Sequence, residues 1–283
     1  MLALVAQAHA LNSRTWVSGT GTDQAGCGPL ATPCRTMQYA HDNTVAGGEI
    51  DVKDAAGYGT LTITKSITIF NEGVGTAGLI AATGNVVTVN AAASDKIVLR
   101  GLTIEGQNSA ANGIAYLAGG PLVVDHCAIG GFAFTGPYVT GNGILVRPAS
   151  GSVKLSVSDS LFTNNGYTAI QALPASGAPT IAINVDRATV VGNLNGIGAS
   201  SNDAPNSVIA INVTHSNVSQ NASYGLWLLG TAQMTIGDTV VSKNAVGVSN
   251  ASNPNGMSSF GNNMISDNVT DFTGAMPIAK ALR

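Results

Sequence analysis

The stretch TIAINVDRATVVGN at residues 180–193 is matched 28 residues later by VIAINVTHSNVSQN at residues 208–221. In both copies, apolar residues alternate with small or polar ones until a turn-like pair interrupts the pattern. A second, shorter apolar run then ends in Asn. Strict alternation is typical of a strand with one buried face. The two copies therefore predict two short strands per repeat, joined by a tight turn.

The same unit recurs along much of the chain. An apolar residue followed by two turn-like residues returns in steps of 23 to 33 residues, at Leu99, Val124, Val157, Val185, Val213, Ile236 and Phe260. A third apolar run opens each unit at a small residue, as in Asn195-Gly196-Ile197. A period of this length is that of one solenoid coil. We predict an all-β fold, a right-handed parallel β-helix of about eight to nine coils.

Five asparagines stand at one register of the repeat. They are Asn165, Asn193, Asn221, Asn244 and Asn268. In stacked coils their side-chain amides would lie above one another, each able to donate to the next. Such an asparagine ladder would also satisfy backbone groups of a buried turn. We predict a structural role for these residues.

With this repeat, the chain resembles the pectate-lyase-like β-helix superfamily over roughly residues 47 to 270. Residues 33–41 are expected to form a short capping helix before a first strand at residues 47–52, which is similar to the N-terminal cap of that superfamily. We therefore expect an N-terminal cap over residues 11–46, a parallel β-helix over 47–270 and a C-terminal cap over 271–283. The resemblance implies a polysaccharide lyase, epimerase or hydrolase, but one scaffold carries many functions.

The composition excludes some classes of partner. The net charge is −3 with 10% charged residues, and no basic run suggests a nucleic-acid groove. No stretch approaches the ~20 apolar residues that span a bilayer. The chain is therefore expected to bind no nucleic acid and to have no membrane span.

Two features at the N-terminus suggest export. Ala8-His9-Ala10 matches a small-x-small cleavage pattern, so residues 1–10 are either a signal-peptide remnant or a frayed terminus. Cys27 and Cys34 are seven residues apart across two prolines, which suits a local disulfide in an oxidising compartment. We expect a secreted, periplasmic or cell-surface protein.

The candidates for catalysis are polar residues of the turns, namely Asp125, His126, Asp159, Arg187 and Arg147. Lyases of the resembled superfamily use a calcium-binding carboxylate cluster with a basic residue, and its hydrolases use clustered aspartates; neither pattern stands here as a motif. Asp159 and Asp186 on neighbouring coils would lie about 4.8 Å apart, so they could bind Ca²⁺ or form a plain polar stack that Arg187 neutralises. Lacking a calcium motif, we predict no cofactor or metal.

One cysteine is left over from the predicted disulfide. Cys127 falls in a column that otherwise holds Leu102, Ser160, Ala188, Ser216, Thr239 and Asn263, which are mostly small residues. A free cysteine in such a column behaves as a small apolar side chain. We predict that Cys127 is buried and is not a nucleophile.

Candidate binding residues come from two places. Outward positions of the third strand hold Leu117, Leu145, Leu173, Trp227 and Leu229. This apolar stripe is either a partner or oligomer surface or lies under turn loops. The longest insertion, residues 130–141, carries Phe132, Phe134 and Tyr138. Aromatic rings on such a loop could stack on sugars, or the two phenylalanines could hold the loop to the sheet.

These observations leave two main hypotheses and a weaker third. The first is an exported or cell-surface β-helix that binds a polysaccharide or protein partner, with self-association through the apolar stripe. The second is an enzyme of the resembled superfamily, and the third is an adhesin or passenger segment. Two or more carboxylates with a Lys or Arg within reach in one cleft would favour the enzyme.

Overall fold

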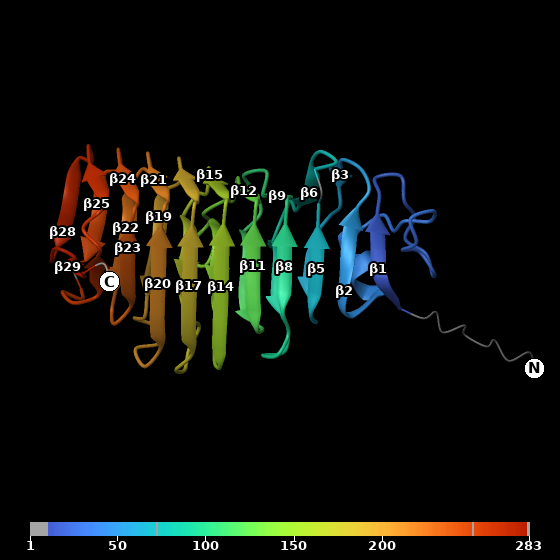
Figure 1. The fold of residues 1–283 in the computed structure, drawn as a ribbon, viewed down its shortest axis with the longest axis horizontal. Helices are drawn as coiled ribbons and strands as arrows, with labels where there is room; N and C mark the ends of the chain where they lie inside the picture. Colours follow the sequence, from blue (N-terminus) through green and yellow to red (C-terminus); the bar gives the residue numbers. More distant parts are fainter. Residues whose placement is uncertain (1–10, 72, 251, 282–283) are drawn as a thin grey trace, which may run out of the picture.

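A computed structural model describes residues 11–71, 73–250 and 252–281. Three sheets run along the whole molecule, and the chain adds one strand to each sheet in turn (Figure 1). Neighbouring strands within each sheet are parallel, as Ile181 beside Ile209 illustrates. The predicted all-β parallel solenoid is confirmed, and nine strands stacked in two of the sheets are separated by eight turns.

Sheet A is the longest and begins at the N-terminal end. Its eleven strands are β1 (Asn12–Val17), β2 (Thr44–Val52), β5 (Ile67–Phe70), β8 (Ile97–Arg100), β11 (Pro121–Asp125), β14 (Ser152–Ser158), β17 (Thr180–Asp186), β20 (Val208–Thr214), β23 (Gln233–Gly237), β26 (Met257–Ser259) and β29 (Ile278–Ala279). The alternation of the repeat decides its faces. Ile181, Ile183 and Val185 of β17 are buried, whereas Ala182 between them is half-buried and Asn184 is exposed.

Sheet B follows each strand of sheet A after a tight corner, and most of its strands have only three residues. They are β3 (Ala56–Gly57), β6 (Ala77–Ile80), β9 (Leu102–Glu105), β12 (Ala128–Gly130), β15 (Leu161–Thr163), β18 (Thr189–Val191), β21 (Asn217–Ser219), β24 (Val240–Ser242) and β27 (Met264–Ser266). In each three-residue strand of this sheet, the central apolar residue points inward. Ile129, Phe162 and Val190 are fully buried examples.

Sheet C closes each turn. Its strands are β4 (Leu61–Ile63), β7 (Asn85–Asn90), β10 (Asn112–Ala118), β13 (Asn142–Val146), β16 (Thr168–Ala172), β19 (Asn195–Ser200), β22 (Tyr224–Leu229), β25 (Val246–Asn250) and β28 (Thr270–Gly274). Ile144, Ile170 and Ile197 pair across β13, β16 and β19 and are fully buried. The inward columns of the three sheets together make one continuous core.

The asparagine ladder is confirmed at the corner between sheets B and C. The side-chain amide of Asn165 donates to Asn193 Oδ1 at 2.7 Å, Asn193 to Asn221 at 3.0 Å, Asn221 to Asn244 at 3.0 Å and Asn244 to Asn268 at 2.9 Å. Each acceptor oxygen also takes the backbone N–H of the preceding asparagine. A second ladder joins Asn142 to Asn112 and Asn112 to Asn85. This second ladder was not predicted from the sequence.

The two ends of the solenoid differ. Near the N-terminal end lie the predicted Cys27–Cys34 disulfide and α1 (Met37–Asp42), the one helix among the described residues. Helix α1 packs against β1, β2 and β4, and Met37 and Ala40 are buried. Strand β1 lies inside the expected N-terminal cap, and strand β29 with all but the first residue of β28 lies inside the expected C-terminal cap; all three extend the sheets. Residues 1–10, with the predicted signal-peptide remnant, lie outside the described residues.

None of the helical residues that the structure describes forms a segment long and apolar enough to cross a bilayer.

Candidate functional site

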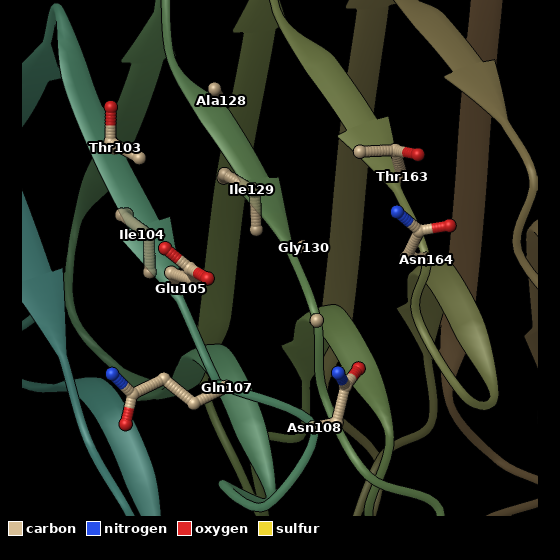
Figure 2. Close-up of a pocket in the computed structure, with 11 residues that line it drawn as sticks. Thr103, Ile104, Glu105, Gln107, Asn108, Ala128, Ile129, Gly130, Thr163 and Asn164 are labelled. Atoms are coloured by element: carbon tan, nitrogen blue, oxygen red, sulfur yellow. The ribbon is translucent and has the colours of Figure 1, made fainter.

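A groove of about 510 Å³ crosses the outer face of sheet B over β9, β12 and β15 (Figure 2). Its floor is low because Ala128 and Gly130 are the outward residues of β12. Gly130 stands between Glu105 on β9 and Thr163 on β15 in register. A Cβ atom at Gly130 would lie 2.1 Å from the carbonyl oxygen of Thr163, so a larger residue does not fit there.

The walls of this groove are polar. Beyond the strand ends, Gln107, Asn108 and Asn164 adopt positive φ values of 51°, 55° and 55° and line one end (Figure 2). Thr103, Glu105 and Thr163 line its length. Among the described residues, none of these six side chains makes a hydrogen bond or ion pair. Their polar groups are therefore available to a ligand.

A charged ridge runs along the corner between sheets A and B, where strands of sheet B begin. It consists of Arg100, Asp125, His126, Asp159, Asp186, Arg187, His215 and Asp238. Arg187 donates two hydrogen bonds to Asp159, both of 2.8 Å, and a further one to Asp186. His215 Nδ1 lies 2.8 Å from Asp186 Oδ1. Stacking coils therefore brings together residues that are 28 or 29 positions apart in the chain.

Contacts within the ridge favour the ionised forms of Asp125 and Asp159. For Asp159, the hydrogen bonds from Arg187 hold the pKa of the carboxyl below its ordinary value. For Asp125, desolvation opposes ionisation, but hydrogen bonds from Ser158 and His126 outweigh it and lower the pKa. The carboxylates beside Arg187 raise the pKa of its guanidinium above the ordinary value. Arg187 is therefore held in its charged form.

The ridge brings together four of the five catalytic candidates. Asp125, His126 and Asp159 offer ligand atoms within 4.8 Å of one another, so they could hold a metal ion. Asp159 already gives both carboxylate oxygens to Arg187, whose positive charge opposes a second cation. Arg147 follows β13, at the corner between sheets C and A, away from the ridge. Its guanidinium donates to the carbonyl oxygen of Leu173 at 3.3 Å. Among the described residues, no hydrogen bond or ion pair joins Arg147 to the other four.

Rings on the long insertion lie at the opposite edge of sheet B. Phe132 is buried and holds the loop to the solenoid, whereas Phe134 and Tyr138 are 42% and 62% exposed. Phe134 stacks on Tyr167 of the next coil with 5.0 Å between ring centroids, and Tyr138 lies 5.5 Å from Tyr167. Phe134, Tyr138 and Tyr167 form the aromatic cluster. Tyr167 was not predicted as part of a site, because nothing in the sequence links it to a loop about 30 residues earlier.

The outer face of sheet C is mostly closed. Of the predicted apolar stripe, Leu145, Leu173 and Trp227 are buried, Leu117 is half-buried and Leu229 is 37% exposed. Trp227 lies flat over Gly198, where a Cβ atom would come within 2.1 Å of its ring. Most of the stripe is therefore covered.

Cys127 is buried, as predicted. Its side chain is 2% exposed, and burial raises the pKa of its thiol to about 11. A thiol with this pKa is almost entirely protonated near neutral pH and is a poor nucleophile. Cys127 thus packs in the core beside Ser160, whose hydroxyl oxygen accepts the backbone N–H of Cys127 at 3.1 Å.

The groove thus has a different boundary on each side. The charged ridge lies where the strands of sheet B begin, since His126 is two residues before Ala128 of the groove floor. The aromatic cluster follows them, since Gly131 lines the groove and opens the loop of Phe134 and Tyr138. No protein-family model, curated protein or solved structure matches this chain.

Proposed function

We propose that this protein binds an extended polysaccharide along the groove of sheet B, with sugar rings packed against the aromatic cluster. The observation that carries the proposal is the set of six unpartnered polar side chains in one groove, whose lining residue Gly131 opens the loop that carries the exposed rings of Phe134 and Tyr138. Sugar hydroxyls match amide, hydroxyl and carboxylate partners. The apolar faces of sugar rings match aromatic rings.

The solenoid geometry suits a linear polymer. Coils repeat about every 4.8 Å, which is close to the length of one hexose unit. Successive sugars could therefore meet equivalent positions on successive strands. The groove already spans three such strands, β9, β12 and β15.

An enzymatic role has less support. Arg187 and the carboxylates Asp159 and Asp186 are within hydrogen-bond reach of one another, as an enzyme would need. They stand on an exposed ridge, however, and line none of the groove of sheet B. A guanidinium held by two carboxylates is also a poor proton acceptor. We therefore place binding before lyase, epimerase or hydrolase activity.

Three finer features belong to the same proposal. A right-handed coil is expected because parallel crossovers are right-handed in about 98% of cases. Export is supported by the Cys27–Cys34 disulfide, which persists in oxidising compartments. Kinship with the pectate-lyase-like superfamily is supported by the three-sheet parallel architecture and the asparagine ladder.

The test is a glycan screen followed by titration of the best ligand against three variants. Tyr138→Ala removes an exposed ring and should weaken binding about ten-fold, the usual order for a lost stacking contact. Tyr138→Phe keeps the ring and should retain most of the affinity. Val208→Ala, a control at a similarly exposed position (61%) on sheet A, should leave binding unchanged. Failure of the wild-type protein to bind any glycan would refute the proposal.

A further inference from the structure

We infer that the polysaccharide bound by this groove carries free amino groups and is not a polyuronate; this inference rests on the proposed function. Its basis is the charge of the lining. Glu105 is the single charged residue among the eleven that line the groove. The other polar members are neutral amides and hydroxyls of Gln107, Asn108, Asn164, Thr103 and Thr163.

Glu105 is also an uncompensated charge. It is exposed on β9, and no Lys, Arg or His among the described residues forms an ion pair with it. The carboxylates of the nearby ridge differ in this respect. Asp125 pairs with Arg100 and His126, and Asp159 pairs with Arg187. The groove itself therefore carries one net negative charge with no cation to balance it.

A polyuronate presents one carboxylate per sugar. Binding it here would bring like charges toward Glu105 with no arginine or lysine in the lining to receive them, which is unfavourable. A polymer of amino sugars instead places ammonium groups beside this carboxylate, while its hydroxyls meet the amides. Charge complementarity of this kind selects between ligands more than it adds affinity.

The position of Glu105 makes it suited to read one sugar of a bound chain. It is in register with Gly130, the low point of the floor, so a sugar lying over Gly130 would be beside the carboxylate (Figure 2). Gln107 and Asn108 follow Glu105 by two and three residues and line the adjoining end of the groove. We assign Glu105 as the residue that determines specificity for the amine.

The experiment compares three probes of equal length: an oligomer of glucosamine, an oligomer of N-acetylglucosamine and an oligogalacturonate. The first two share a sugar backbone. Their 2-nitrogen is an ammonium group in the glucosamine oligomer and a neutral acetamide in its acetylated form. Wild-type protein should prefer the glucosamine oligomer over its acetylated form by about three-fold, as expected for an exposed ion pair. Added salt should reduce this preference. The oligogalacturonate should bind most weakly.

Two variants isolate the carboxylate. Glu105→Gln should abolish the preference for the free amine and leave binding of the acetylated oligomer unchanged. Asp203→Asn makes the same charge change at an exposed position outside the groove and should preserve the preference. A preference that survives in Glu105→Gln, or tighter binding of oligogalacturonate that still depends on Tyr138, overturns this inference alone. Absence of binding to every glycan overturns the proposed function and this inference with it.

Discussion

At the scale of single residues, an asparagine side chain contributes differently to stability inside and outside the solenoid. Asn212 donates to Asn184 at 2.8 Å on the outer face of sheet A, where both are exposed. Asn221 makes the same kind of bond to Asn244 at 3.0 Å, but inside the corner between sheets B and C. Water can replace the outer partner and cannot replace the inner one. Stability should therefore depend on the inner bond far more than on the outer one.

Replacing Asn221 with Ala tests this difference. The change removes the oxygen that accepts the backbone N–H of Asn193 at 3.1 Å, and it leaves that buried donor without a partner. An orphaned buried group costs about 1–3 kcal/mol, so we expect the free energy of unfolding to fall by about 2 kcal/mol. Denaturant titration gives the value. The matched control Asn212→Ala should change stability by less than about 0.5 kcal/mol, and equal losses in the two variants would contradict the argument.

At the scale of elements, the repeat predicts which residues form the inward columns, but it does not predict the shape of the outward surface. Ile104, Ile129 and Phe162 follow from the spacing alone, because each coil must bury the same position. The groove could not be predicted. It depends on the outward residues Ala128 and Gly130 being smaller than their neighbours on both sides, and a three-residue strand is too short to display an alternation of its own.

The candidate site shows the same limit. Stacking of Asp159 with Asp186 and Arg187 could be foreseen, because all three lie at the same corner of the repeat on neighbouring coils. The contact of Phe134 with Tyr167 could not, because the insertion breaks the register on which the prediction depends. Sequence periodicity therefore locates residues that obey the repeat. The proposed binding site depends largely on residues that depart from it.

Helix α1 provides a prediction about pH. His41 on α1 is buried, and desolvation, the largest influence, lowers the pKa of its imidazole below the ordinary 6.5. Its Nε2 atom accepts the backbone N–H of Thr64 at 3.4 Å and its Nδ1 lies 3.0 Å from Asp42, so the neutral ring satisfies both partners. A proton on Nε2 would oppose the N–H of Thr64.

The sign of the effect follows from linkage. Above about pH 6.5 the ring is neutral in both the folded and the unfolded chain, and no penalty arises. As the pH falls through 6.5, the unfolded chain takes up a proton that the folded chain resists, and stability decreases. We expect amides of α1 and β1 to lose protection from hydrogen exchange between about pH 7.5 and pH 5.5, after correction for intrinsic rates. His41→Gln, which is neutral throughout, should reduce this loss, and an undiminished loss would count against the role of His41.

At the scale of the whole molecule, the two ends of the solenoid are unequally protected. A coil in the middle contacts a coil on each side, whereas an end coil has one such neighbour. At the N-terminal end, α1 and the disulfide segment pack against the first strands and bury Met37 and Ala40. At the other end, Ile265 and Phe272 occupy inward columns but are only partly buried. Met264 and Val269 beside them are 55% and 89% exposed.

This asymmetry predicts where unfolding begins. Because the stability of a solenoid is close to a sum over coils and their interfaces, the coil with least burial and one neighbour should open first. Hydrogen exchange followed by mass spectrometry should show the lowest protection in β27 and β28, and higher protection toward β15 and β16 in the centre of the molecule. Limited proteolysis should cut first in the C-terminal coil. Strands β1 and β2, covered by α1 and closed by Cys27–Cys34, should be better protected than the C-terminal coil, whereas equal protection of the two ends would contradict a stability set by coverage of the end coils.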